Sequence, residues 1–179
     1  YNSGAPVGLS AADLRDCLRS RIAKVDPQGA DAALREMVVI GHSPGGLLTK
    51  FAAVDTGDRL VQSLTGKDFE TLNIADDFKD ALRRSLVVEH LPFVTHVLFI
   101  ATPHRGSFRS IALVRKIVGR LIKLPASVVK LPFNMYGIVR DDIRNLFGDR
   151  IPTSIDSMSP DNPVLKELAE IPLAPGVTG

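Results

Sequence analysis

The sequence has few of the residues that indicate a disulfide scaffold, a metal centre or a membrane span. Its 179 residues include one cysteine, Cys17, which excludes an intrachain disulfide. We expect Cys17 to be buried, because it falls on the apolar side of a predicted helix. No apolar run approaches the ~18 residues of a membrane span, and no group of Cys and His residues has metal-ligand spacing. We therefore expect neither a metal nor another cofactor.

A large excess of one charge is also absent. The formal net charge is +2, which gives no indication of nucleic acid binding. One stretch is locally basic, since residues 90–140 contain no Asp or Glu but eight Lys and Arg. Within it, residues 108–124 predict a helix with a wide aliphatic arc and a narrow basic face of Arg109, Lys116, Arg120 and Lys123. This face has two interpretations: the solvated side of a packed helix, or a lid that contacts an anionic membrane surface.

The sequence does contain alternating helix and strand patterns of one globular domain. Short apolar runs at residues 37–40 and 95–101 are typical of parallel strands that are covered on both faces. Helical patterns follow the capping motif at Ser10 as far as Asp26, and recur at residues 44–57, 76–86 and 159–170. This order of strands and helices predicts an α/β fold.

One motif joins the first strand to the next helix. Residues 38–46 read VVIGHSPGG, and their central five residues fit G-x-S-x-G around Ser43. In such a strand-turn-helix the serine is held clear of the sheet as a nucleophile, and the next backbone N–H helps to bind the oxyanion. Pro44 supplies no N–H at that position. The proline suits the start of a helix, but it removes one expected donor.

Two segments together resemble the lipase and esterase branch of the α/β-hydrolase superfamily. These are VVIGHSPGGLLTK (residues 38–50) and VLFIATPHRGS (residues 97–107). The resemblance implies an α/β-hydrolase fold in which Ser43 is the nucleophile and residues 108–150 form an inserted helical cap. It also implies that the acid and the histidine follow later in the chain, and that an oxyanion loop precedes Tyr1. We thus expect residues 1–179 to be a central fragment of the domain, with the flanking strands outside it.

Four histidines in the sequence are candidate partners of Ser43. His104 lies in the loop after the second strand, and we expect it to shape the site through a hydrogen bond rather than to act as the triad base. We expect His42 to pack under the turn, His96 to lie in the core or at the sheet edge, and His90 to lie at the surface. No triad acid is assigned among the exposed-looking acids, which are Asp141, Asp142, Asp156 and Asp161.

These features predict a serine hydrolase that cleaves a small-molecule or lipid ester through an acyl-enzyme on Ser43. Loss of the donor at Pro44 is expected to weaken turnover. The alternative is a pseudo-hydrolase that keeps the fold for binding or for membrane association. Neither hypothesis requires a cofactor or a nucleic acid partner, and neither specifies the compartment.

Overall fold

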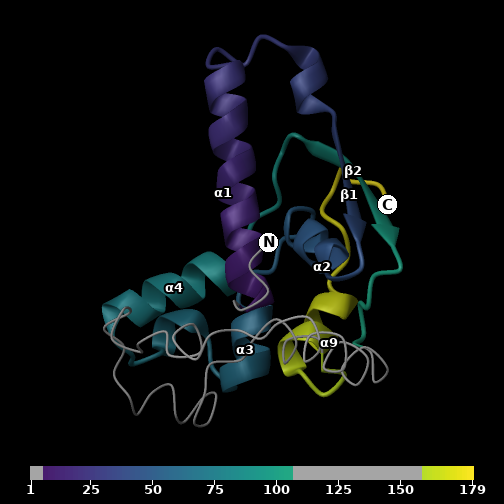
Figure 1. The fold of residues 1–179 in the computed structure, drawn as a ribbon. Coiled ribbons are helices and arrows are strands. Elements are labelled where there is room, and N and C mark those ends of the chain that lie inside the picture. The colour runs from purple at the N-terminus through teal and green to yellow at the C-terminus, as the bar shows by residue number, and fades with distance from the viewer. Residues whose placement is uncertain (1–5, 107–158) are drawn as a thin grey trace, which may run out of the picture.

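The computed structural model describes residues 6–106 and 159–179. Within these ranges, five helices and two strands carry the fold (Figure 1). They are α1 (Val7–Val25), β1 (Met37–His42), α2 (Pro44–Phe51), α3 (Arg59–Thr65), α4 (Asp76–Leu86), β2 (Val94–Ile100) and α9 (Pro163–Glu170), with short 3₁₀ turns at Ala32–Arg35 and Phe69–Thr71. The expected cap at residues 108–150, with its basic helix at 108–124, lies outside the described residues.

The two strands are parallel neighbours, as the mixed order of elements predicts. Val39 is in register with Val97, Ile40 with Leu98 and His42 with Ile100. Because the strands are parallel and end in register, the segments that follow them emerge at the same edge of the sheet. Ser43 follows β1 at this edge, and the 101–106 loop follows β2.

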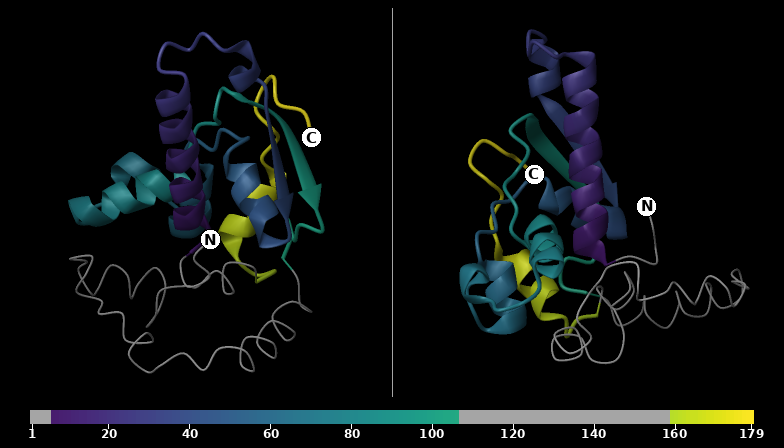
Figure 2. Two further views of the ribbon diagram at one scale, coloured as in Figure 1. Left: turned by 45° about the horizontal axis from the view of Figure 1, so that its top comes forward. Right: turned by 90° about the vertical axis from the view of Figure 1, so that its left-hand side faces the viewer.

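The helices cover one face of this sheet. Helix α2 packs on both strands and α1 packs on α2, so that both helices lie on the same side of the strands (Figures 1 and 2). On this side the inward residues of the strands, Val39, Val97 and Phe99, pack with Ala52 and Leu91. A larger cluster joins α2 to α1, α3, α4 and α9 around Leu47, Phe51, Leu60, Phe69, Leu82 and Leu168.

The opposite face of the sheet is uncovered among the described residues. Val38 and Ile40 of β1 are 55% and 63% exposed, and Leu98 and Ile100 of β2 are 53% and 46% exposed. Within the described residues the strands are covered on one face only, so the expected cover on both faces stays a prediction for the complete domain. Successive side chains of a strand point to opposite faces of the sheet. Val38, Ile40, Leu98 and Ile100 therefore share one face, and the described helices pack on the other.

The C-terminal residues lie along the edge of β2 that faces away from β1 (Figure 2, right). Thr178 forms an isolated parallel bridge with His96. The N–H of Val97 donates to the carbonyl of Thr178 at 2.9 Å, and the N–H of Thr178 donates to the carbonyl of Thr95 at 2.9 Å. The sequence pattern had indicated no third pairing segment, since five residues bounded by Pro175 and Gly179 carry little strand signal.

Helix α1 departs from expectation at its start and on its buried face. The helix begins at Val7, before Ser10, because the N–H of Ser10 already donates to the carbonyl of Pro6 at 3.1 Å. Its buried side includes Ala11 and Arg15. Cys17 is exposed, contrary to prediction, since two residues of helix turn it about 200° away from Arg15. The predicted end of the helix at Asp26 is confirmed.

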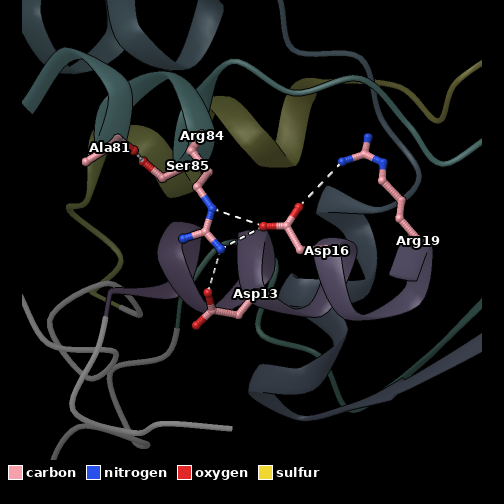
Figure 3. Close-up of polar contacts among 6 residues, drawn as sticks. All are labelled: Asp13, Asp16, Arg19, Ala81, Arg84 and Ser85. Carbon is pink, nitrogen blue, oxygen red and sulfur yellow. Dashed lines mark hydrogen bonds and ion pairs between the residues drawn. The ribbon is translucent and has the colours of Figure 1, made fainter. Parts of the chain in front are cut away.

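A set of exposed ion pairs also connects α1 with α4 (Figure 3). The Arg84 guanidinium lies 2.8 Å from an oxygen of Asp13 and 2.7 Å from an oxygen of Asp16. The hydrogen bonds that Arg84 donates to Asp16, and then the one that it donates to Asp13, raise the pKa of Arg84. All three side chains are about half exposed or more, so each pair contributes little to stability, roughly 0.2–1 kcal/mol.

Candidate functional site

Ser43 forms the turn between β1 and α2, in a backbone conformation that non-glycine residues rarely adopt. Its φ is 53° and its ψ is −128°. Two hydrogen bonds fix it: the Ser43 N–H donates to the carbonyl of Ile100 at 2.9 Å, and the Gly46 N–H donates to the carbonyl of Ser43 at 3.1 Å. Such a conformation costs on the order of 1–3 kcal/mol and persists only where the surroundings impose it.

The hydroxyl of Ser43 is not used to cap the helix that follows. Serine just before a helix commonly accepts a hydrogen bond from a first-turn N–H. Ser43 makes no such bond, because its positive φ differs from the extended backbone of a capping serine. The residue is half-buried at the C-terminal edge of the sheet. Its hydroxyl thus remains available for chemistry rather than for local structure.

Two glycines let the strand and the helix approach each other at this turn. A Cβ on Gly41 would lie 2.4 Å from the Cα of Gly46, and a Cβ on Gly46 would lie 1.8 Å from the Oγ1 of Thr102. Gly45, the second glycine of the G-x-S-x-G pattern, has open space around its Cβ position. Packing at the turn therefore requires Gly41 and Gly46, whereas it does not require Gly45.

The loop after β2 mirrors the turn at Ser43. Ala101 has a φ of 49°, so it and Ser43 are the non-glycine residues of positive φ in the described chain. Because His42 is in register with Ile100, Ser43 and Ala101 follow at matching positions. The turn at Ala101 brings Thr102 against the first turn of α2, where the buried Oγ1 of Thr102 has no hydrogen-bond partner among the described residues.

Pro44 is the first residue of α2, as predicted. A proline restricts the residue before it, mainly by disfavouring the helical region. Ser43 nevertheless holds its positive φ in front of Pro44. The proline is thus compatible with the turn, and its chemical consequence is the missing N–H at the position after the serine.

His104 lies in the loop at the same edge of the sheet as Ser43. Its ring meets the ring of Phe99 edge to face, with centroids 4.6 Å apart. Burial, and then the nearby charge of Lys50, lower the pKa of His104. Its buried Nδ1 has no hydrogen-bond partner among the described residues. The predicted role of His104 in shaping the site through a hydrogen bond therefore stays a prediction.

Polar contacts of Lys50 and of the end of α9 hold the 101–106 loop. Lys50 is 7% exposed, and its Nζ donates to the carbonyl of Ala169 at 2.9 Å. Burial lowers the pKa of Lys50, and the charge of Glu170 opposes that shift. Glu170 also pairs with Arg105 of the loop at 3.0 Å. The loop after β2 is thus tied to α9, and α9 is tied to α2.

The other histidines lie elsewhere in the structure. His42 is exposed on the uncovered face of the sheet, so the expected packing under the turn is wrong; its side chain alternates away from the face that α2 covers. His96 is also exposed, with its Nδ1 2.9 Å from the hydroxyl of Thr95. His90 contacts Asp55 through its ring and its backbone N–H, each at 2.8 Å. The backbone N–H of His90 is the first cause of the lowered pKa of Asp55.

Partners for a serine nucleophile are therefore not assembled within the described residues. All four histidines of the sequence fall in these ranges, and no hydrogen bond joins one of them to Ser43. The exposed carboxylate of Asp161 lies 4.0 Å from Lys166. Asp141, Asp142 and Asp156 lie outside the described ranges.

The same ranges contain neither a candidate metal centre nor a membrane-spanning helix. In residues 6–106 and 159–179, no group of three or more His, Cys, Asp and Glu side chains could hold a metal ion. No helix described by the structure is both long enough and apolar enough to cross a bilayer. A hollow lined by Cys17, Ser20, Arg21 and Lys24 lies along α1 and does not include Ser43.

The sequence motif located the turn but missed the residues that pack around it. Gly46 and Thr102 belong to the motifs quoted for residues 38–50 and 97–107, yet their contact depends on how the two strands pair. The available sequence signal for this contact was that a second glycine, Gly46, directly follows the G-x-S-x-G pattern. No protein-family model, curated protein or solved structure matches this chain. Its function is therefore inferred from its own residues and their geometry.

Proposed function

We propose that this chain is part of a serine hydrolase of the α/β-hydrolase superfamily, resembling lipases and esterases, with Ser43 as the nucleophile. The observation that supports the proposal most is the conformation of Ser43. Ser43 joins a parallel strand to a helix with a φ of 53°, and its hydroxyl does not cap that helix. A strained residue that serves no local structural purpose is typical of a functional site.

The proposed reaction is acyl transfer from an ester to water. The hydroxyl oxygen of Ser43 attacks the ester carbonyl, and a histidine base takes the hydroxyl proton. The tetrahedral intermediate then expels the alcohol, which receives the proton from the histidine. Water attacks the resulting acyl-serine by the same steps and releases the acid. Hydrolysis by this route needs no cofactor.

The base and acid of this reaction are proposed to follow later in the complete chain. The resemblance orders the triad as serine, acid and histidine, and none of the four histidines described here is bonded to Ser43. We therefore expect a protein of residues 1–179 alone to lack Ser43-dependent turnover. The oxyanion loop and the cap at residues 108–150 belong to the same proposal.

The fold proposed for the complete domain also accounts for the uncovered sheet face. Parallel strands are almost always covered on both faces. Val38, Ile40, Leu98 and Ile100 form an aliphatic surface with no charged member. In an α/β-hydrolase domain, further helices would pack on this surface and further strands would extend the sheet beyond β1 and Thr178.

Ester hydrolysis by the protein from its complete reading frame tests the proposal. We expect turnover of short-chain p-nitrophenyl esters that is lost in Ser43→Ala, while the far-UV circular dichroism spectrum is unchanged. Ser63→Ala is the matched control, since that serine lies on α3 and donates to the carbonyl of Leu60. Equal turnover by wild type and Ser43→Ala would assign the activity to another residue and reject the proposal.

A pseudo-hydrolase is the second candidate, and Pro44 is the observation that favours it. The proline removes the donor that a hydrolase normally places directly after its nucleophile. In this alternative the fold serves to bind a ligand or a membrane surface. An intact acid and histidine in the complete chain, together with no turnover by either wild type or Pro44→Gln, would favour it over the esterase.

A further inference from the structure

The backbone of β1, the backbone of α2 and the side chain of Thr102 meet at the turn around Ser43 with no room for a methyl group on Gly41 or Gly46. Gly41 at the end of β1 faces Gly46 in the first turn of α2, and Gly46 faces Thr102 after β2. A Cβ on Gly41 would lie 2.4 Å from the Cα of Gly46. A Cβ on Gly46 would lie 1.8 Å from Oγ1, 2.6 Å from Cγ2 and 2.7 Å from Cβ of Thr102. Thr102 thus occupies the place that a side chain on residue 46 would need.

The contact between Thr102 and Gly46 reaches Ser43 through one hydrogen bond. The Gly46 N–H donates to the carbonyl of Ser43 at 3.1 Å, and the Ser43 N–H donates to the carbonyl of Ile100 at 2.9 Å. Ile100 is two residues before Thr102 in the same chain segment. The backbone of Ser43 is therefore connected on both sides to the segment that carries Thr102.

We propose that Thr102 is a positioning residue for Ser43, which holds the first turn of α2 by its shape. The proposal rests on the proposed function, since it concerns the nucleophile of that reaction. Thr102 packs directly on Gly46, so that the turn cannot relax toward the loop after β2 and Ser43 keeps its positive φ. The positive φ of Ala101 sets the chain direction that makes this packing possible.

The positioning is steric rather than polar. The Oγ1 of Thr102 is buried and has no hydrogen-bond partner among the described residues. Valine has nearly the same shape as threonine, with a methyl group in place of the hydroxyl. Thr102→Val should therefore preserve the position of Ser43, whereas Thr102→Gly removes the packing and lets the turn relax.

Kinetics of the protein from its complete reading frame test the positioning. The readouts are kcat and KM for p-nitrophenyl butyrate and the rate of Ser43 labelling by a fluorophosphonate, at a temperature where each variant is folded by circular dichroism. We expect Thr102→Val to stay within about twofold of wild type. Thr102→Gly should lower kcat and the labelling rate about tenfold to hundredfold with little change in KM, because misplacement of a reacting group costs rates of this order. A loss in Thr102→Val equal to that in Thr102→Gly would show that the hydroxyl acts in the reaction and would overturn the steric role.

Stability supplies a second test that does not depend on activity. Gly46→Ala should unfold at a clearly lower temperature than wild type, and adding Thr102→Gly should restore part of the loss, because the three nearest atoms to the new Cβ belong to Thr102. Gly45→Ala is the matched control and should not be destabilised, since its Cβ has open space. Equal stability of Gly46→Ala and Gly45→Ala, or no restoration in the double variant, would contradict the packing. If wild-type Ser43 is never labelled, the proposed function fails and the positioning role fails with it, whereas the stability result still decides the contact.

Discussion

At the scale of single residues, the turn at Ser43 combines an unusual backbone with an unused hydroxyl. A serine before a helix ordinarily stabilises that helix by capping it, by about 0.5–2 kcal/mol. Ser43 gives up that contribution and also adopts a positive φ. Gly41, Gly46 and Thr102 approach one another closely at this turn, without room for a further methyl group on either glycine. A residue held in this way is best explained by a role outside local folding.

Restoring a backbone donor after Ser43 should raise the rate of the proposed reaction. Pro44→Gln supplies the N–H that the proline lacks, and one oxyanion donor is worth about 2.7–4 kcal/mol, or roughly 10²–10³ in turnover. We expect kcat to rise about tenfold or more with little change in KM, because the new N–H acts mainly on the transition state. Steady-state kinetics on a p-nitrophenyl ester measure the change.

The control for this substitution is Pro92→Gln, at an exposed proline in the segment between α4 and β2. It should leave kcat unchanged. Brisk hydrolysis by wild type that Pro44→Gln does not improve would mean that other donors hold the oxyanion, and that Pro44 carries no catalytic cost.

His104 should make stability depend on pH. Burial and the charge of Lys50 lower the pKa of His104 in the folded protein, so the unfolded chain binds this proton more readily. Stability from this residue is thus fully present above the unfolded pKa of about 6.5, and is lost as pH falls through that value toward the lower folded pKa. His104→Phe keeps an aromatic contact with Phe99 but cannot titrate.

Urea unfolding between about pH 8 and about pH 5 measures this effect. The free energy of unfolding should fall less steeply with decreasing pH in His104→Phe than in wild type. Ser63→Ala, which removes no titratable group, is the comparison variant and should follow the wild-type profile. Identical slopes in wild type and His104→Phe would show that the His104 ring stays hydrated in the folded state.

At the scale of elements, the sequence predicted best where a local signal decides. Helix α4 covers Asp76–Leu86 as expected, because acids at its start and arginines at its end match the helix dipole. Strand β2 lies one residue from its predicted ends, since its apolar run is bounded by a loop. Helix α2 stops at Phe51, earlier than the predicted residue 57, and α9 starts at Pro163 behind the capping Asn162 rather than at residue 159.

Features that depend on contacts distant in the chain could not be predicted from local patterns. Helix α3 has seven residues, and its buried residues are Leu60 and Val61. Two adjacent apolar residues do not show the repeat of three to four residues from which a helix is predicted. Likewise, Ser43 was located by its motif, whereas Thr102 reaches Gly46 only after the two strands have paired. The position of Ser43 is thus a local property of the sequence, but the packing that holds it is not.

Thr56 joins the segment after α2 to the end of α4 and should contribute measurably to stability. Its hydroxyl donates to the carbonyl of Leu86 at 2.7 Å and accepts from the N–H of Val88 at 2.8 Å, in a site where Thr56 is 1% exposed. Thr56→Val keeps the shape but leaves both buried backbone groups without this partner. We expect a loss of about 1–3 kcal/mol in the free energy of unfolding by urea.

Thr71→Val is the matched control for this prediction. The Thr71 hydroxyl donates to the carbonyl of Asp68 in an exposed turn, so its loss should change stability by about 0.5 kcal/mol or less. If Thr56→Val and Thr71→Val lose the same free energy, the hydroxyl of Thr56 does not link these elements.

At the scale of the whole molecule, the sheet separates a packed face from an apolar uncovered one. The helices α1 and α2 lie on one side, and Val38, Ile40, Leu98 and Ile100 are exposed on the other. Four aliphatic side chains in register on two strands make a surface that soluble domains normally cover. The described residues thus supply the helices for one face of the sheet and leave its other face apolar and exposed.

The basic face predicted at residues 108–124 gives a test at the same scale. If it contacts membranes, the protein from its complete reading frame should bind vesicles rich in phosphatidylserine, and binding should weaken as salt screens the charges. Each basic residue near such a surface is worth about 1 kcal/mol. Replacing Arg109, Lys116, Arg120 and Lys123 together by glutamine should therefore abolish most binding in a vesicle sedimentation assay. Equal binding by this variant, or none by wild type, would leave the face as the solvated side of a packed helix.

Covalent labelling of Ser43 tests the central claim most directly. The protein from its complete reading frame is treated with a fluorophosphonate, and the modified peptide is identified by mass spectrometry. We predict a single phosphonyl adduct on Ser43 that is absent in Ser43→Ala and after heat denaturation, because only the folded turn presents an activated hydroxyl. No adduct on Ser43 in the folded protein, or an adduct on a different serine, would contradict its assignment as the nucleophile.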